Sequence, residues 1–189
     1  MNKGINIQLI IEGCLKGHAP SEQKLFESYY AYVKSICLRY AGNLEEAEEM
    51  LNDTFYKVFR YLERYDQEQR FLPWLRKVCI NACLEYNRKY LQKIAIEPLE
   101  KSMEETIGPD HDFFELDPQV DVSACLRLLS PAYRTIFNLY VIEEYKHHEI
   151  AEILSISVNT SKSNLSRAKE VLKKHLAKSQ NTKTKSNTN

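Results

Sequence analysis

Apolar residues in the first half of the chain recur at spacings of three and four, the period of one face of an α-helix. Ser21 is placed to begin the second helix, and Asn43 with Glu46 forms the capping-box pattern that begins the third. The segment 64–70 has no apolar period and is expected to be a loop, after which Pro73 fits a first helical turn. The four expected helices span residues 7–14, 25–40, 47–62 and 71–86.

The last third of the chain repeats the helical period in shorter segments. A helix is expected over 122–129, and Ser130 followed by Pro131 begins the next one, which runs to Val141. Two further helices, 149–154 and 160–176, are separated by the tight turn 155–157. Two short helices joined in this way form a helix-turn-helix pattern. The polar, low-complexity tail after residue 178 is expected to be disordered.

Charge divides the chain more sharply than its zero net charge suggests. Residues 1–93 carry a net charge of +2 and residues 121–189 a net charge of +5, whereas residues 94–120 carry −7. That middle segment also contains three prolines and a glycine, so it lacks the periodicity of a helix. The predicted fold is therefore all-α, with two helical domains, 1–93 and 121–178, joined by an acidic linker, 94–120, and followed by a disordered tail, 179–189.

Several classes of protein are disfavoured by the sequence. No apolar run exceeds five residues, and Met1 is not followed by an apolar signal segment, so we expect a cytoplasmic protein without membrane insertion. Five cysteines, an odd number, lie in apolar patterns and are expected to be reduced. No glycine-rich phosphate loop is present, and Cys79 with Cys83 lacks further ligands at metal spacing. We therefore expect no enzyme activity, no cofactor and no metal.

Short polar and cationic side chains gather near the start of the second helix of the helix-turn-helix. Residues of this kind at a helix N-terminus can enter the major groove of DNA, where they contact base edges and phosphates. DNA contact is the preferred interpretation, and a solvated face on a helix that only packs is the alternative. The candidate DNA-contacting residues are Thr160, Lys162, Ser163, Asn164 and Arg167.

Three motifs, in this order, make the chain similar to bacterial RNA polymerase sigma factors of the extracytoplasmic-function (ECF) group. The first is the stretch Ala47 to Phe55, and the second is Trp74-Leu75 followed by Asn81, Glu85 and Arg88. The third is Glu149-Ile150-Ala151 with Thr160-Ser161-Lys162-Ser163-Asn164-Leu165-Ser166-Arg167-Ala168. The resemblance covers residues 5–93 and 121–178.

Four positions depart from the usual pattern of the family. Glu49 replaces aspartate and Asn52 replaces glutamine in the first motif, while Ser161 replaces valine and Asn164 replaces arginine in the third. None of these changes removes a helix or alters the order of the motifs. Ser161 puts a hydroxyl where a buried methyl group is usual, and Asn164 removes a cation that could contact DNA.

The resemblance implies that the helix 47–62 docks on the core RNA polymerase. The side chains that lie off its apolar face are mostly acidic, which suits a basic partner surface. A merely solvated helix face is the alternative. The candidate polymerase-binding residues are Glu48, Glu49, Asn52 and Asp53.

The resemblance also implies that residues 64–88 recognise and help to melt minus-10 DNA. Residues 60–93 hold eight Lys and Arg against four acids, with aromatic residues interleaved, which suits phosphates and unstacked bases. Phe71, Trp74 and Tyr86 also lie on the apolar face, so for them core packing is the preferred role. The candidate minus-10 residues are Arg64, Tyr65, Arg70, Lys77, Asn81 and Arg88.

Together these features predict a promoter-specificity subunit that performs no bond chemistry. It would bind core RNA polymerase, read double-stranded minus-35 DNA with residues 157–168, and hold the melted minus-10 strand. The resemblance further implies an inhibitory anti-sigma partner and a linker that threads the polymerase channel. Two alternatives remain open: a stand-alone helix-turn-helix regulator, and a helical interaction protein that does not bind DNA.

Overall fold

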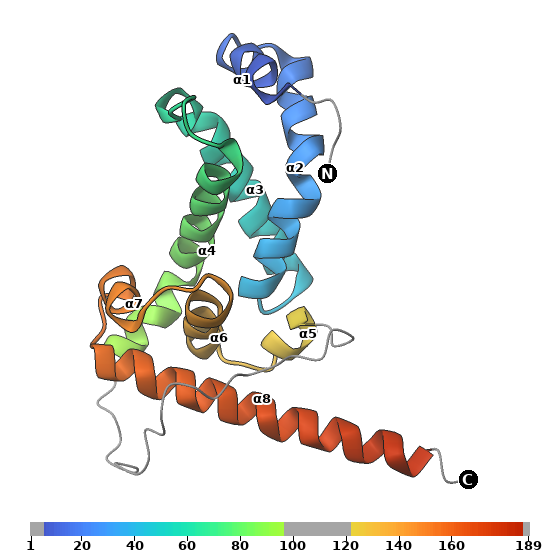
Figure 1. Ribbon diagram of the computed structural model, residues 1–189, viewed down its shortest axis with the longest axis vertical. Coiled ribbons are helices and arrows are strands. Elements are labelled where there is room, and N and C mark those ends of the chain that lie inside the picture. Colours follow the sequence, from blue (N-terminus) through green and yellow to red (C-terminus); the bar gives the residue numbers. More distant parts are fainter. Residues whose placement is uncertain (1–5, 97–121, 187–189) are drawn as a thin grey trace. The chain divides into compact units, whose positions relative to one another are not determined.

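The computed structural model describes residues 6–96 and 122–186, and all regular elements within these ranges are helical (Figure 1). The chain forms two compact units that divide between Tyr86 and Asn87. This division falls inside a helix, earlier than the boundary at residue 93 that composition suggests. The acidic linker lies almost wholly outside the described residues. No described helix is both long enough and apolar enough to cross a membrane.

Two helices begin the first unit, α1 (Ile7–Leu15) and α2 (Ala19–Tyr40). They are joined at Gly17, whose φ of +69° is a backbone conformation that favours glycine. Gly13 lies against Ser21 so closely that an added Cβ would come within 2.1 Å of the Ser21 hydroxyl oxygen. The prediction that Ser21 begins α2 is wrong, because His18 is the N-cap. Ser21 lies in the first turn of the helix, and its hydroxyl forms a hydrogen bond with Nδ1 of the His18 ring at 2.9 Å.

Helix α3 (Leu44–Tyr61) and the part of α4 (Phe71–Ile96) up to Tyr86 complete the first unit, with the short 3₁₀ helix η1 (Leu62–Arg64) between the two helices. The predicted cap at Asn43 is confirmed, since its side chain accepts a hydrogen bond from the Glu46 N–H at 2.8 Å. The Glu46 carboxylate reaches back to the N–H of Gly42 rather than to that of Asn43. The segment from Tyr65 to α4 is the predicted loop.

The core of the first unit lies between α2, α3 and α4. Val33, Tyr40, Met50, Val58 and Leu75 are among its fully buried side chains. Val33 and Tyr40 are seven residues apart on α2, and Met50 and Val58 are eight apart on α3. These spacings correspond to about two helical turns, so the amphipathic helices bury the faces that the sequence pattern predicts.

Three of the core residues are cysteines, Cys37 on α2 and Cys79 and Cys83 on α4, and all three are buried. The Cys37 and Cys79 sulfurs lie 3.8 Å apart, and the two thiols are free. The hydrogen bond with Cys37 lowers the pKa of the Cys79 thiol, and the same bond raises the pKa of Cys37. Hydrogen bonds to both neighbours, with burial, also raise the pKa of Cys83.

The second unit is built from short helices and one long one. They are α5 (Val122–Leu126), α6 (Pro131–Phe137), the π-helix η2 (Asn138–Ile142), α7 (His147–Leu154) and α8 (Val158–Ser186). The predicted cap at Ser130 is confirmed, because its hydroxyl accepts a hydrogen bond from the Tyr133 N–H at 3.3 Å. Helices α6 and α7 both pack on α8.

Two features of the second unit differ from the sequence prediction. The helix that begins at Pro131 changes to π-helical hydrogen bonding at Asn138, whose buried side-chain amide donates to the Arg134 carbonyl at 2.9 Å. Helix α8 continues to Ser186, past residue 178, where disorder was expected. The polar tail contains neither glycine nor proline, the residues that end helices most strongly, so nothing in its local sequence stops α8 there.

Candidate polymerase and DNA interfaces

The polar face of α3 presents the four residues that the sequence selects for polymerase binding. Glu48 and Asn52 are exposed and Asp53 is half-buried. Glu49 is exposed as well, and its carboxylate accepts a hydrogen bond from the Tyr86 hydroxyl of α4 at 2.7 Å. The four side chains therefore lie on one surface of the first unit, which is acidic and bordered by α4.

Lys57 ties this acidic face to α4. Its ammonium group lies 2.7 Å from the carboxylate of Asp53 and 2.7 Å from that of Glu85. Burial acts to lower the pKa of Lys57, but the hydrogen bonds to both carboxylates outweigh it and raise the pKa. Asp53 is thus partly neutralised within the protein, whereas Glu49 pairs with the uncharged Tyr86 hydroxyl.

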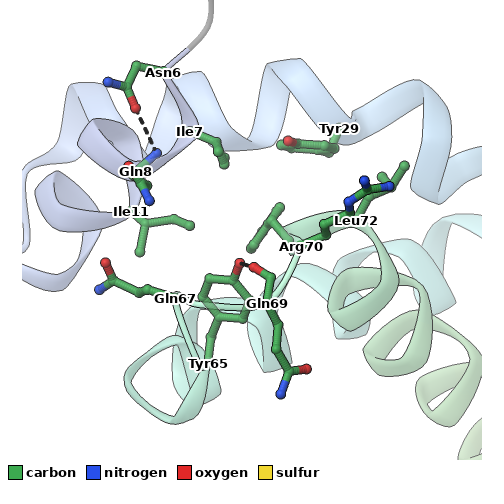
Figure 2. A pocket seen from close by; sticks show the side chains of 11 residues that line it. Asn6, Ile7, Gln8, Ile11, Tyr29, Tyr65, Gln67, Gln69, Arg70 and Leu72 are labelled. Carbon is green, nitrogen blue, oxygen red and sulfur yellow. Dashed lines mark hydrogen bonds between the residues drawn. The ribbon is translucent and has the colours of Figure 1, made fainter.

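The loop 65–70 borders a shallow pocket of about 390 Å³ between α1, α2 and the start of α4 (Figure 2). Arg70, Tyr29 and the side chains of Gln67 and Gln69 line it, opposite Asn6 and Gln8 at the beginning of α1. The lining thus combines an aromatic ring with a cation and amides. Such groups can stack on a nucleic-acid base and satisfy its polar edge.

Tyr65 is not placed as the sequence suggested. Its side chain is buried, its ring packs on Phe71 and Trp74 at centroid distances of 5.4 and 5.2 Å, and its hydroxyl donates to the Gln69 carbonyl. Burial raises the pKa of this hydroxyl, with a smaller effect from Asp66. The Tyr65 ring is packed in an aromatic cluster with Phe71 and Trp74 and is not exposed to DNA. Tyr65 therefore stabilises the loop.

The remaining minus-10 candidates are exposed. Lys77, Asn81 and Arg88 share one face of α4, since four and eleven residues correspond to near-whole helical turns. Arg64 lies over the Tyr61 ring, 5.2 Å from its centroid, and Arg70 lines the pocket. The sequence analysis missed Gln67, Gln69 and Asn6, because amides in a loop and at a helix start carry no periodic signal.

Helices α7 and α8 form the predicted helix-turn-helix. The turn closes at Ser155, which adopts the left-handed conformation with φ of 55°. Ser157 then caps α8 through its hydroxyl, which accepts a hydrogen bond from the Thr160 N–H at 2.9 Å. The Thr160 hydroxyl lies 2.8 Å from that of Ser157, so Thr160 takes part in the cap.

The exposed face of α8 near this cap defines the candidate groove-reading surface. Arg167 is exposed, and Lys162 and Ser163 are half-exposed. Asn159 and Ser166 are exposed on the same side of the helix, and the sequence analysis did not select them. Helical geometry places Lys162 and Arg167 on opposite flanks of this face, with Asn159 and Ser166 between them.

Asn164 is wrongly placed by the sequence analysis. Its side chain is buried, 6 % exposed, next to the core residues Leu165 and Ala168. A position that carries arginine in the family pattern was expected to face DNA, but the rotation of α8 against its neighbours turns it inward here. Asn164 is therefore removed from the groove-reading surface.

The buried hydroxyl of Ser161 has a specific partner. It lies 2.9 Å from Nδ1 of His147, whose ring is buried and stacks on Tyr140 at a centroid distance of 4.4 Å. The hydrogen bond joins the start of α7 to the start of α8. The serine that replaces the usual valine is thus explained by a polar contact inside the helix-turn-helix.

Replacing Ser161 with valine should destabilise the second unit by about 1–2 kcal/mol, because a buried hydrogen bond to His147 is lost. Denaturant unfolding monitored by circular dichroism measures this change. Ser166→Val, the same substitution on the exposed face of α8, is the control and should change stability by less than about 0.5 kcal/mol. Equal effects of the two substitutions would contradict a role for the His147 contact.

Comparison with known proteins identifies the class to which these surfaces belong. The sigma-70 region 2 family matches residues 25–92, and the sigma-70 region 4 family matches residues 119–172. The first range contains the acidic face of α3 and the loop 65–70, and the second contains the helix-turn-helix. The chain therefore belongs to the sigma-70 family of RNA polymerase sigma factors. Within that family it is an ECF sigma factor, a non-enzymatic protein that promotes initiation of transcription with RNA polymerase.

The chain is similar to other ECF sigma factors over most of their length. The ECF sigma factor SigW of Bacillus subtilis is 26% identical over 171 residues, which cover 85% of this chain and 91% of SigW. SigM of the same organism is 27% identical over 153 residues, covering 79% of this chain and 91% of SigM. The solved structure of the sigma factor RpoE in complex with the anti-sigma factor NepR from Bartonella quintana is 17% identical, with a TM-score of 0.48 and coverage of 82% and 96%.

Proposed function

We propose that this sigma factor divides promoter recognition between its two units. In this proposal the acidic face of α3 docks on core RNA polymerase, the pocket loop and α4 hold the melted minus-10 strand, and the start of α8 reads duplex minus-35 DNA. The observation that carries the proposal is that region 2 and region 4 matches occur in one chain, each over a unit with an exposed polar face. Such a protein acts in the cytoplasm, with the polymerase.

Run-off transcription tests this division of labour. Core polymerase with the full chain should produce discrete transcripts from fragments of the host genome, and core polymerase alone should not. A stand-alone helix-turn-helix regulator would bind duplex DNA but would not co-purify with core polymerase. That outcome would favour the alternative and reject the proposed docking role of α3.

For the minus-10 element, we infer that the pocket beside the loop 65–70 accepts one unstacked base. Its support is the combination of the Tyr29 ring, the Arg70 cation and the loop amides around one cavity. Lys77, Asn81 and Arg88 continue from there along α4, where cations can follow the phosphates of the same strand. Arg64, at the end of η1, lies at the border of the loop.

Arg70→Ala should lower the rate of promoter opening about tenfold, because a cation that holds the displaced strand is lost. Permanganate reactivity of minus-10 thymines measures opening, and binding of a minus-35 duplex should not change. Lys24→Ala, an exposed cation on α2 away from the pocket, is the matched control. If the two variants open promoters equally well, the pocket does not serve this purpose.

For the minus-35 element, Lys162 and Arg167 should have different effects. Lys162 lies in the first turns of α8, where recognition helices contact base edges, so Lys162→Ala should cost about 1–3 kcal/mol on the preferred sequence and relax the preference. Arg167→Ala should weaken all sequences alike and reduce the salt slope by about one, as loss of a phosphate contact does. Titration of matched and scrambled duplexes at several salt concentrations distinguishes the two, and exchanged roles would mean that α8 is rotated differently in the groove.

An inhibitory anti-sigma partner fits the same surfaces. To block transcription it would have to cover the acidic face of α3, the groove-reading side of α8, or both. If the partner covers α3, its competition with core polymerase for the full chain should depend on Glu48 and Glu49, which are exposed on α3.

A further inference from the structure

The buried cysteine cluster of the first unit has the composition of a metal site. Its three sulfur atoms, from Cys37, Cys79 and Cys83, all lie within 4.8 Å of one another, and the Cys37 and Cys79 sulfurs are 3.8 Å apart. Cys79 and Cys83 are one helical turn apart on α4, so both face α2, where Cys37 lies. The cluster therefore links two helices that are distant in the sequence.

The distances suit a single ion. Three sulfurs that surround an ion in one plane at about 2.3 Å, the bond length of zinc to thiolate, lie about 4 Å from one another. The observed separations differ from this value by less than about 1 Å, so the side chains could close on an ion without moving the helices. Three cysteines at this spacing distinguish the cluster from a single buried thiol, which would behave as a small apolar residue.

We propose that Cys37, Cys79 and Cys83 form a three-coordinate sulfur site for a soft monovalent metal ion, Cu(I), in which one cysteine binds as a thiolate and the other two as thiols. The proposal concerns the core of the first unit and does not depend on how the surfaces of the protein meet polymerase or DNA. No function assigned to the chain uses these thiols.

The chemistry of the donors favours a soft ion. Thiolates bind Cu(I) and zinc more strongly than hard cations such as magnesium or calcium. Structural zinc is almost always held by four ligands, and no fourth His, Cys, Asp or Glu joins the cluster in the part of the chain that the structure describes. The hydroxyl of Thr54 does not serve as a fourth ligand, because it donates a hydrogen bond to the Met50 carbonyl at 2.7 Å. A three-coordinate ion therefore fits better than zinc.

Burial also favours a monovalent ion. All three cysteines are completely inaccessible to solvent, and a buried complex is stable only if its net charge is small. A monovalent ion is neutralised by one thiolate, which forms when one thiol loses its proton to solvent, whereas a divalent ion requires two.

Full burial has a kinetic consequence as well. An ion can reach the sulfurs only when α2 and α4 separate transiently, so uptake should be much slower than diffusion. Once bound, the ion cross-links the two helices and stabilises the folded unit by mass action. Saturation with Cu(I) should therefore raise the thermal unfolding midpoint of the first unit.

Anaerobic titration of the full, reduced chain with Cu(I), in competition with a Cu(I) chelator, tests the site. We expect one equivalent bound, a thiolate-to-copper absorption band in the ultraviolet, and three sulfur ligands by X-ray absorption. Cys37→Ala and Cys83→Ala should each weaken binding by at least about 100-fold, as loss of a ligand does. Cys14→Ala is the matched control, because Cys14 is buried in the same unit but outside the cluster.

Each readout has a result that overturns the proposal. Failure of the wild type to compete with the chelator, oxygen or nitrogen ligands in the X-ray absorption spectrum, or zinc bound more tightly than Cu(I) would each reject it. So would equal weakening by Cys14→Ala and Cys37→Ala. The spectroscopic readouts use the unmodified chain, so they decide the matter even if a cysteine variant does not fold.

Discussion

Arg134→Met is expected to destabilise the second unit by about 3–5 kcal/mol. The guanidinium of Arg134 is 3 % exposed and donates to the carbonyl of Leu126 at 2.9 Å and to that of Leu129 at 2.8 Å. It thereby holds the end of α5 and the following turn against α6. Methionine has a similar reach but no donor, so the two buried carbonyls would lose these charged hydrogen bonds.

Denaturant unfolding of the full chain, with minus-35 duplex binding as a second readout, measures this loss. The second unit should unfold at lower denaturant while the first unit is unchanged. Arg127→Met is the control, because Arg127 lies in the same segment and is only half-buried. Comparable destabilisation by both substitutions would contradict a specific contribution of the two carbonyl contacts of Arg134.

Charge reversal on α3 is expected to have the second large effect. Glu49→Lys combined with Asp53→Lys should weaken the complex with core polymerase by about 100-fold, because two acids that face a basic partner become like charges. The intramolecular partners of these acids, the Tyr86 hydroxyl and the Lys57 ammonium, are at the surface or only partly buried. Their loss should cost the fold no more than about 1 kcal/mol.

A control with the same change in charge separates docking from general electrostatics. Glu12→Lys with Glu27→Lys changes two exposed acids of α1 and α2 and should leave the affinity within about threefold. Affinity is measured at several salt concentrations, together with helicity. Should the α3 double variant remain helical and bind with unchanged affinity and salt dependence, α3 is not the docking helix.

Local features of the sequence were sufficient for most of the secondary structure. The caps at Asn43 and Ser130 and the proline at the start of α6 act on the residues next to them, so they could be read without knowledge of the fold. The same is true of the helix-turn-helix, whose two helices adjoin in the sequence. Ser21 was misassigned because its close contact with Gly13 arises where α1 packs on α2, and the sequence around Ser21 does not show that contact.

Site residues that depend on helix rotation were less predictable. Helical spacing placed Asn164 on the polar face of α8 beside Thr160 and Arg167, yet it is buried. Tyr65 lies in a loop without an apolar period, but its ring is buried by packing on Phe71 and Trp74 of α4. In both cases burial is decided by side chains of other helices, and spacing along one helix does not contain that information.

The sequence by itself determined the order and type of the helices, the acidic face of α3 and the family motifs, because each depends on residues within a few turns of one another. Only the tertiary structure decided the partners of the buried polar groups: Arg134 with two carbonyls, and Ser161 with His147. Only the tertiary structure also placed Cys37 beside Cys79, which is 42 residues away in the sequence. The sequence alone showed Cys79 and Cys83 without a further ligand. Such contacts arise when amphipathic helices pack, and their partners are set by the geometry of packing rather than by distance along the chain.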